Sequence, residues 1–130
     1  MGGIIGYIDS LVDIIITNSY GKINVTGLSG TVGGLTPIML HDVNHLQITN
    51  FYLVSDITGG DDSGVIIGIV YSEPNITINS SFFNGDINEN LDAVGTGESV
   101  NFINSNTEDM LIKNTYEEEG WDFEEIWQIE

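Results

Sequence analysis

The segment Ile16-Thr17-Asn18-Ser19-Tyr20 recurs as Ile48-Thr49-Asn50-Phe51-Tyr52 and again as Ile78-Asn79-Ser80-Ser81-Phe82. Isoleucine aligns with isoleucine, a small polar residue follows two positions later, and an aromatic ring closes each segment. A fixed period of about thirty residues is typical of proteins whose repeats stack as single structural units. We expect the column of Ile16, Ile48 and Ile78 to point into a shared core. The column of Tyr20, Tyr52 and Phe82 should form an aromatic ladder, either inside or along one face.

Two further columns recur with the same spacing. A glycine strip repeats as Gly2-Gly3-Ile4-Ile5-Gly6, Gly33-Gly34-Leu35-Thr36-Pro37 and Gly64-Val65-Ile66-Ile67-Gly68, and Asn24, Asp56 and Asp86 also align. The pattern predicts an all-β fold, a parallel β-helix-like solenoid of about three coils over residues 1–88, divided near 2–32, 33–63 and 64–88. Three short strands are expected in each coil: Ile4–Ile8, Asp13–Thr17 and Lys22–Thr26; Leu35–Leu40, Leu46–Tyr52 and Val54–Thr58; Val65–Tyr71, Ile76–Asn79 and Ser81–Ile87.

Residues 89–130 are predicted to form a loop followed by a cap. The loop, residues 89–106, is rich in Asn, Asp, Gly and Ser and contains one expected strand at Ser99–Ile103. Thr107 is a good N-cap for a short helix that should end near Gly120. Alternation of apolar and acidic residues predicts a last strand over 121–129. Its apolar members Trp121, Phe123, Ile126 and Trp127 are expected to cover the open end of the solenoid, although exposed aromatics there could also anchor a partner.

The charge balance excludes several classes of partner. The chain of 130 residues carries 20 acids against two lysines, Lys22 and Lys113, for a net charge of −18. Nucleic acid is therefore excluded as a partner, because its binding relies on Lys and Arg. No apolar run reaches the roughly 18 residues of a membrane span, so membrane insertion is not expected. The chain lacks cysteine, which removes disulfides and thiolate chemistry.

Several of these segments resemble a known repeat family. Gly2-Gly3-Ile4-Ile5-Gly6-Tyr7, followed by Ile16-Thr17-Asn18-Ser19-Tyr20 and Val25-Thr26-Gly27, is similar to the GLUG repeat of microbial surface proteins. The third coil has Val65 where the first glycine is expected, and Pro37 replaces the closing glycine of the second. The tail, Thr107–Ile129, is similar to the segment that closes such arrays. The resemblance implies a right-handed β-solenoid in secreted or surface-exposed proteins with adhesive or scaffolding roles, and it transfers no catalytic residues.

Two sets of side chains are candidate metal ligands. His41 and His45 have the i, i+4 spacing that suits a metal on a helix, but they fall between strand-like runs, where a solvated corner is the simpler reading. Asp61 and Asp62, near Asp56, could hold calcium through hard oxygen ligands, although their spacing also suits an ordinary acidic turn. No cofactor is otherwise expected.

The expected function is non-catalytic. The column of Asn24, Asp56 and Asp86 could place carboxylates on one face, but no set of nucleophile, base and orienting group can be assembled. We expect a structural or adhesive module of a cell-surface or virion-surface protein. Its N-terminal end should meet either preceding solenoid repeats or a second copy, since an uncapped β edge invites pairing. The alternative is a carbohydrate-binding or carbohydrate-processing module, with a glycan or host-surface ligand.

Overall fold

Ten strands dominate the computed structural model, which describes residues 1–6, 13–39, 45–71, 75–97 and 100–128. The strands are β1 (Asp13–Gly27), β2 (Thr31–Gly33), β3 (Thr36–Met39), β4 (His45–Gly59), β5 (Asp62–Gly64), β6 (Ile67–Val70), β7 (Ile76–Asn79), β8 (Phe82–Asn84), β9 (Val94–Thr96) and β10 (Ile103–Ser105). A 3₁₀ turn (Asp109–Leu111) and the short helix α1 (Lys113–Glu117) follow. The expected all-β class is thus confirmed.

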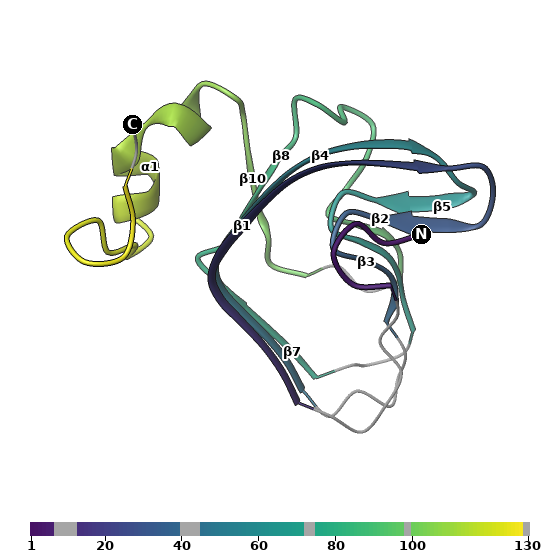
Figure 1. The fold of residues 1–130 in the computed structure, drawn as a ribbon, viewed down its shortest axis with the longest axis horizontal. Helices are drawn as coiled ribbons and strands as arrows, with labels where there is room; N and C mark the ends of the chain where they lie inside the picture. Colours follow the sequence, from purple (N-terminus) through teal and green to yellow (C-terminus); the bar gives the residue numbers. More distant parts are fainter. Residues whose placement is uncertain (7–12, 40–44, 72–74, 98–99, 129–130) are drawn as a thin grey trace.

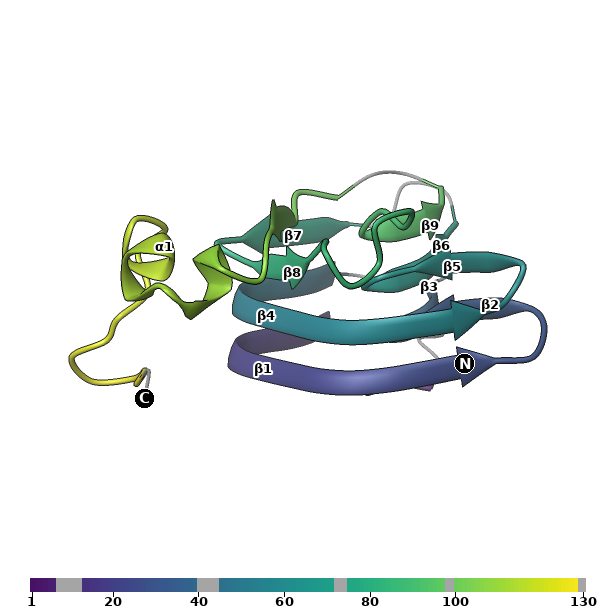
Figure 2. The same cartoon turned by 90° about the horizontal axis from the view of Figure 1, so that it is seen from above.

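The strands form three parallel sheets whose order follows the period of the sequence. The first sheet contains β1, β4, β7, β8 and β10, the second β2 and β5, and the third β3, β6 and β9. Asp13 pairs with His45 and Thr31 with Asp62, so partners lie 32 and 31 residues apart. We call each passage of the chain through the sheets a layer. Figure 1 looks nearly along the stack, so successive layers overlie one another, and Figure 2 shows β1, β4 and β8 one above the next.

The two long strands correct the expected breaks between Thr17 and Lys22 and between Tyr52 and Val54. Pairing of β1 with β4 continues through both places. The bend lies inside each strand, at Asn18 (φ 47°) and Asn50 (φ 51°), and Ser80 (φ 47°) stands at the same corner between β7 and β8. Asparagine adopts this left-handed conformation more readily than most residues, so the strand turns a corner without losing its register.

The core lies between the sheets and is filled by residues that alternate along the strands. Phe51 and Leu53 of β4 are buried in it together with Phe83 of β8, and Leu35 and Ile66 meet them from the facing side. Because side chains of a strand alternate between its faces, Tyr52 points to the outer face of the same sheet. Each fully buried aliphatic or aromatic side chain stabilises the fold by about 1.5–3 kcal/mol.

The glycine strip has a steric cause. Gly2 bridges to Gly33, and Gly33 pairs with Gly64, so the three form one column. A Cβ at Gly33 would collide with the backbone oxygen of Thr36, and one at Gly64 would collide with that of Ile67. The chain therefore folds back over each glycine in the same way, which only a residue without a side chain permits.

Several expected element boundaries are wrong. Residues 4–6 form no strand, since the isolated bridge in this stretch lies at Gly2, and 7–8 lie outside the described residues. The strands β2, β5 and β9 occupy stretches expected to be corners or loop, because two or three residues suffice where a parallel neighbour already exists. The strand expected at 99–103 is β10, which begins only at Ile103.

The C-terminal segment departs most from expectation. No strand forms over residues 121–128; these residues make turns instead, and 129 lies outside the described residues. The segment also does not cover the end of the stack. It packs beside it, against the outer face of the sheet where Tyr52, Val54 and Phe82 present an apolar strip (Figures 1 and 2). Covering that strip removes exposed aromatic surface, which stabilises the turns without any strand pairing.

Candidate functional site

The aromatic column runs across three layers on the outer face of the first sheet. Tyr20 pairs in register with Tyr52, and Tyr52 with Phe82. The rings of Tyr20 and Tyr52 stack with centroids 5.3 Å apart and planes inclined by 14°. The column changes from solvent to interior along its length, since Tyr20 is 65% exposed, Tyr52 is half-buried and Phe82 is 2% exposed.

The other expected column, Ile16, Ile48 and Ile78, faces the opposite way. Ile16 pairs with Ile48 and Ile48 with Ile78, and all three pack in the inner core, where Ile48 is fully buried. At the corner between the columns, Asn50 Nδ2 donates to Asn18 Oδ1 at 3.1 Å. The corner amides therefore link two layers at the surface.

The buried end of the aromatic column is enclosed by the C-terminal segment. Tyr116 of α1 lies edge-on to Phe82, with ring centroids 5.1 Å apart, and its hydroxyl donates to the backbone oxygen of Met110 at 2.7 Å. The indole Nε1 of Trp121 donates to the backbone oxygen of Ser80 at 2.8 Å, which fixes the segment to the corner of the third layer. These two hydrogen bonds satisfy polar tips that would otherwise be costly to bury.

Burial alters the acidity of two phenols in this cluster. Desolvation, and then the neighbouring phenol of Tyr52, raises the pKa of Tyr116 to about 12 from the ordinary 10.0. Desolvation, with a smaller contribution from Tyr20, also raises the pKa of Tyr52. Both phenols are therefore neutral hydrogen-bonding groups at physiological pH.

Trp127 lies near Tyr52 of the aromatic column and completes a hollow. Its ring lies 4.4 Å from that of Trp121 and 6.4 Å from that of Tyr52, inclined to the latter by 45°. The hollow has a volume of about 340 Å³, and we call it the aromatic hollow. Aromatic and amphipathic side chains line it: Tyr20, Tyr52, Met110, Tyr116, Trp121, Phe123, Trp127 and Gln128. The indole Nε1 of Trp127 is buried and has no hydrogen-bond partner among the residues that the structure describes.

The residues expected to form the cap thus have different positions. Trp121 is 4% exposed and anchors the segment, whereas Phe123 and Trp127 are partly buried at the aromatic hollow. Ile126 is 51% exposed and belongs to neither apolar cluster described. Lys113 Nζ lies 5.3 Å from the centroid of Phe123 and forms an ion pair with Glu117 at 2.7 Å.

A second feature is the edge of the first sheet. Among the described strands, β1 pairs on one side only, with β4, so its other side presents backbone groups along Asp13–Gly27. Two large apolar side chains near this edge are exposed, Ile15 at 67% and Ile4 at 50%, in addition to Tyr20. An edge of this length and character is a template for pairing with another strand.

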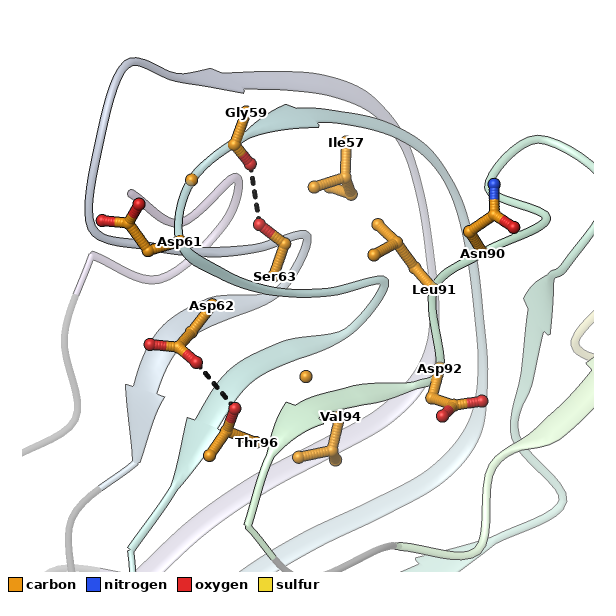
Figure 3. A pocket seen from close by; sticks show the side chains of 12 residues that line it. Ile57, Gly59, Asp61, Asp62, Ser63, Asn90, Leu91, Asp92, Val94 and Thr96 are labelled. Carbon is orange, nitrogen blue, oxygen red and sulfur yellow. Dashed lines mark hydrogen bonds between the residues drawn. The ribbon is translucent and has the colours of Figure 1, made fainter.

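The aspartates proposed as calcium ligands lie around a third feature, an open hollow of about 460 Å³ (Figure 3). Asp61 accepts a hydrogen bond from the amide of Gly30 at 3.1 Å, and Asp62 accepts one from the hydroxyl of Thr96 at 2.8 Å. Both carboxylates therefore already stabilise connections between layers. Asp92 also lines this hollow, and Asp56 instead lines a neighbouring one with Asp86.

Within the described part of the chain, no three His, Cys, Asp or Glu side chains come together as a metal-binding group. His45 is half-buried, with Nε2 at 2.9 Å from Thr77 Oγ1. His41 lies outside the described residues, so the proposed histidine pair stays a prediction, as does calcium at Asp61 and Asp62.

One structural residue had no signal in the sequence. Asn88 is buried beyond the end of β8, where its Oδ1 accepts from the amide of Ile57 at 2.9 Å and its Nδ2 donates to the backbone oxygen of Ser55. Its side chain thereby replaces the missing neighbour strand of β4. In a stretch rich in Asn and Asp, only the three-dimensional position singles it out.

Comparison with known proteins gives a weak likeness. Over 120 residues the chain is 30% identical to a protein of Evansella cellulosilytica named "Putative Gly-rich membrane protein". The match covers 88% of this chain but only 13% of that protein. No helix in the described ranges is both long and apolar enough to cross a bilayer. No family model matches the chain, and no solved structure matches it.

Proposed function

We propose that this chain is a β-solenoid module with a non-catalytic structural or adhesive role, in a protein exposed on the surface of a cell or virion. Its layers are the coils, and its three parallel sheets are the faces. One observation carries the proposal: pairing stays parallel and in register at a spacing of 30 to 32 residues in β1–β4, β2–β5, β3–β6 and β4–β7. Such a spacing means that each layer repeats the path of the one before it.

The unpaired side of β1 supports end-to-end stacking. The same strand pairs in register with β4 on its other side, from Asp13 opposite His45 to Gly27 opposite Gly59, with a break only at the corner of Asn18 and Asn50. A further coil could continue this ladder, supplied either by preceding solenoid repeats or by a second copy of the chain. Pairing would cover backbone groups along the edge and the exposed side chains of Ile15 and Tyr20.

Composition supports a surface role. A net charge of −18 favours solubility and weakens non-specific attraction to nucleic acid and anionic lipid. The likeness of the glycine strip and aromatic column to GLUG repeats also supports a surface role. The name of the matched protein, which describes it as glycine-rich and of a membrane, points the same way. The second candidate function is a carbohydrate-binding module, which the aromatic hollow favours.

Inserting an extra coil tests the solenoid directly. A second copy of residues 33–63 placed after Ser63 preserves the register, because Gly33 then follows Ser63 as Gly64 does now. Solenoid stability is nearly a sum over coils and their interfaces, so we expect the variant to fold with an unchanged or higher urea midpoint. Its m-value should rise by about a quarter, in proportion to the added surface.

A variant carrying the same inserted residues in scrambled order is the matched control and should lose cooperative unfolding. If the duplicated coil is tolerated no better than the scrambled one, the layers are not interchangeable coils, and the solenoid proposal is wrong.

Edge pairing is tested by sedimentation over a wide range of protein concentration, with amide hydrogen exchange measured at both extremes. We expect association at high concentration, with new protection confined to β1. Ile15→Lys should weaken it, because a lysine at an edge strand opposes pairing. Leu111→Lys, which also places a charge at an exposed apolar position but outside β1, should leave it unchanged. Equal behaviour of the two variants, or a strictly monomeric chain, would count against stacking.

A further inference from the structure

Among the hollows, the aromatic hollow is the one whose walls suit a specific ligand. The hollows beside Asp61 and Asp56 have mainly polar walls, and the carboxylates of Asp61 and Asp62 already have partners within the chain. The aromatic hollow has about 340 Å³ and lies within the range of small-ligand sites, which are mostly apolar with a few placed polar groups.

Three rings give the hollow flat apolar walls. Tyr20 and Tyr52 are stacked nearly parallel, and the ring of Trp127 is inclined to Tyr52 by 45°, so the walls are not coplanar. Tyr20 is 65% exposed, which leaves this wall open to solvent. An aromatic face of this kind packs well against a flat ligand surface made of C–H groups, because the ring face is electron-rich and the C–H edge is weakly positive.

The polar groups at the hollow favour a ligand that carries oxygen acceptors. Neither indole N–H is available to a ligand there, since Trp121 Nε1 donates to Ser80 and Trp127 Nε1 is buried, with no hydrogen-bond partner among the described residues. The amide of Gln128 also borders the hollow and can both donate and accept.

Charge narrows the ligand class. The net charge of −18 opposes an anionic ligand, as do the acids at Asp122, Glu124 and Glu125, which neighbour lining residues in the sequence. A quaternary ammonium group suits aromatic rings but offers no hydrogen-bonding group to the amide of Gln128. A neutral sugar ring has both an apolar C–H face and hydroxyl oxygens that accept hydrogen bonds.

We propose that the aromatic hollow binds a neutral sugar residue, which packs on the exposed ring of Tyr20 and forms hydrogen bonds with the amide of Gln128. Such a sugar would be the ligand for the adhesive role proposed above, and the biological use of the site rests on that role. Binding itself does not require pairing at the edge of β1, because the hollow is built from one chain.

The test follows the indole N–H signals of the two tryptophans by NMR during titration of the intact, monomeric chain. The probes are cellohexaose, xylohexaose, mannohexaose and chitohexaose, with oligogalacturonate as the anionic probe and tetramethylammonium chloride as the cationic one. We expect at least one neutral sugar to shift the Trp127 signal in a saturable way, with a smaller shift of the Trp121 signal, whose hydrogen bond is internal.

Matched variants separate the site from a general surface effect. Tyr20→Ala should weaken binding by about tenfold or more, the equivalent of about 1.4 kcal/mol. Tyr71→Ala, which removes an exposed tyrosine outside the hollow, should not change it. Trp127→Phe identifies the Trp127 signal and keeps an aromatic ring, and Gln128→Ala should weaken binding because it removes the amide at the hollow.

Three outcomes overturn the sugar site: no neutral probe shifts the indole signal, only the cation or the anion does, or Tyr20→Ala binds as the unaltered chain does. None of these depends on association at β1. A failed titration with intact edge pairing therefore rejects the sugar site alone, whereas sugar binding by a chain that never associates rejects stacking alone.

Discussion

The aromatic column meets opposite surroundings at its two ends. At the β1 end, Tyr20 is 65% exposed and, among the described residues, stacks on Tyr52 alone; at the β8 end, Phe82 is 2% exposed beneath Tyr116 and Trp121. The two residues are equivalent in the sequence pattern and lie in the same register column. The position of a ring in the sequence pattern therefore determines which face of the sheet it occupies. Whether the ring is buried in the fold or exposed to solvent depends on whether the C-terminal segment packs over it.

The largest effect expected from this comparison is at Phe82. Phe82→Ala should destabilise the fold by about 3–5 kcal/mol, because it leaves a cavity among packed rings. Tyr20→Ala removes mainly one stacked pair, worth about 0.5–1.5 kcal/mol. Urea unfolding followed by circular dichroism measures both. Similar losses of unfolding free energy for the two variants would show that both ends of the column contribute equally to stability.

A smaller effect is expected where a side chain replaces a strand. Asn88→Ala removes both hydrogen bonds to β4 and leaves the amide of Ile57 without a partner, at a cost of about 1–3 kcal/mol. Asn90→Ala, at an exposed neighbouring position, is the control and should stay within about 0.5 kcal/mol of the unaltered chain. Hydrogen exchange at Ile57 should accelerate only in the first variant.

The stability contributed by Tyr116, at the buried end of the aromatic column, should depend on pH in the alkaline range. Since the pKa of Tyr116 is raised to about 12 in the folded chain from the ordinary 10.0, the unfolded chain loses this proton first. Stability from this group is complete below pH 10 and falls as the pH rises from 10 toward 12. Tyr116→Phe should cost about 1–2 kcal/mol at neutral pH through the lost bond to Met110, and should flatten the alkaline fall. Tyr52, whose pKa is also raised, leaves a residual slope. An unchanged alkaline profile would contradict this assignment.

The smallest effect is expected at Lys113, on the surface of the C-terminal segment. Lys113→Met removes the exposed ion pair with Glu117 and the contact with the Phe123 ring, for about 0.5–1 kcal/mol in all. High salt should reduce the difference in stability between Lys113→Met and the unaltered chain, because it screens the ion pair. Thermal unfolding at low and high salt measures the change, and a salt-independent difference would assign the effect to packing instead.

The sequence predicted what depends on spacing. Ile16, Ile48 and Ile78 align in the structure as their period indicates, and so do Tyr20, Tyr52 and Phe82. The isoleucine column faces the core as predicted, but the sequence left open whether the aromatic column lies inside or along one face, because the left-handed corner at Asn18 and Asn50 interrupts the simple alternation of a strand. It also missed the continuity of β1 and β4 for the same reason.

The C-terminal segment was predicted least well. Its alternating apolar and acidic residues suit a strand, but the partner that decides the matter is an apolar strip made by residues far away in sequence, Tyr52, Val54 and Phe82. Rings such as Trp121 and Trp127 can cover such a strip from turns as well as from a strand. The aromatic hollow was invisible for the same reason, since residues from β1, β4 and the segment meet only in the folded chain.

The in-register stack has a mechanical consequence. Force applied along the stack loads the hydrogen bonds between adjacent layers one layer at a time, because each layer is bonded mainly to its neighbours. A tethered chain of this kind should therefore lengthen in steps. Each released layer of about 31 residues would add roughly 100 Å of extended chain, less its small folded thickness.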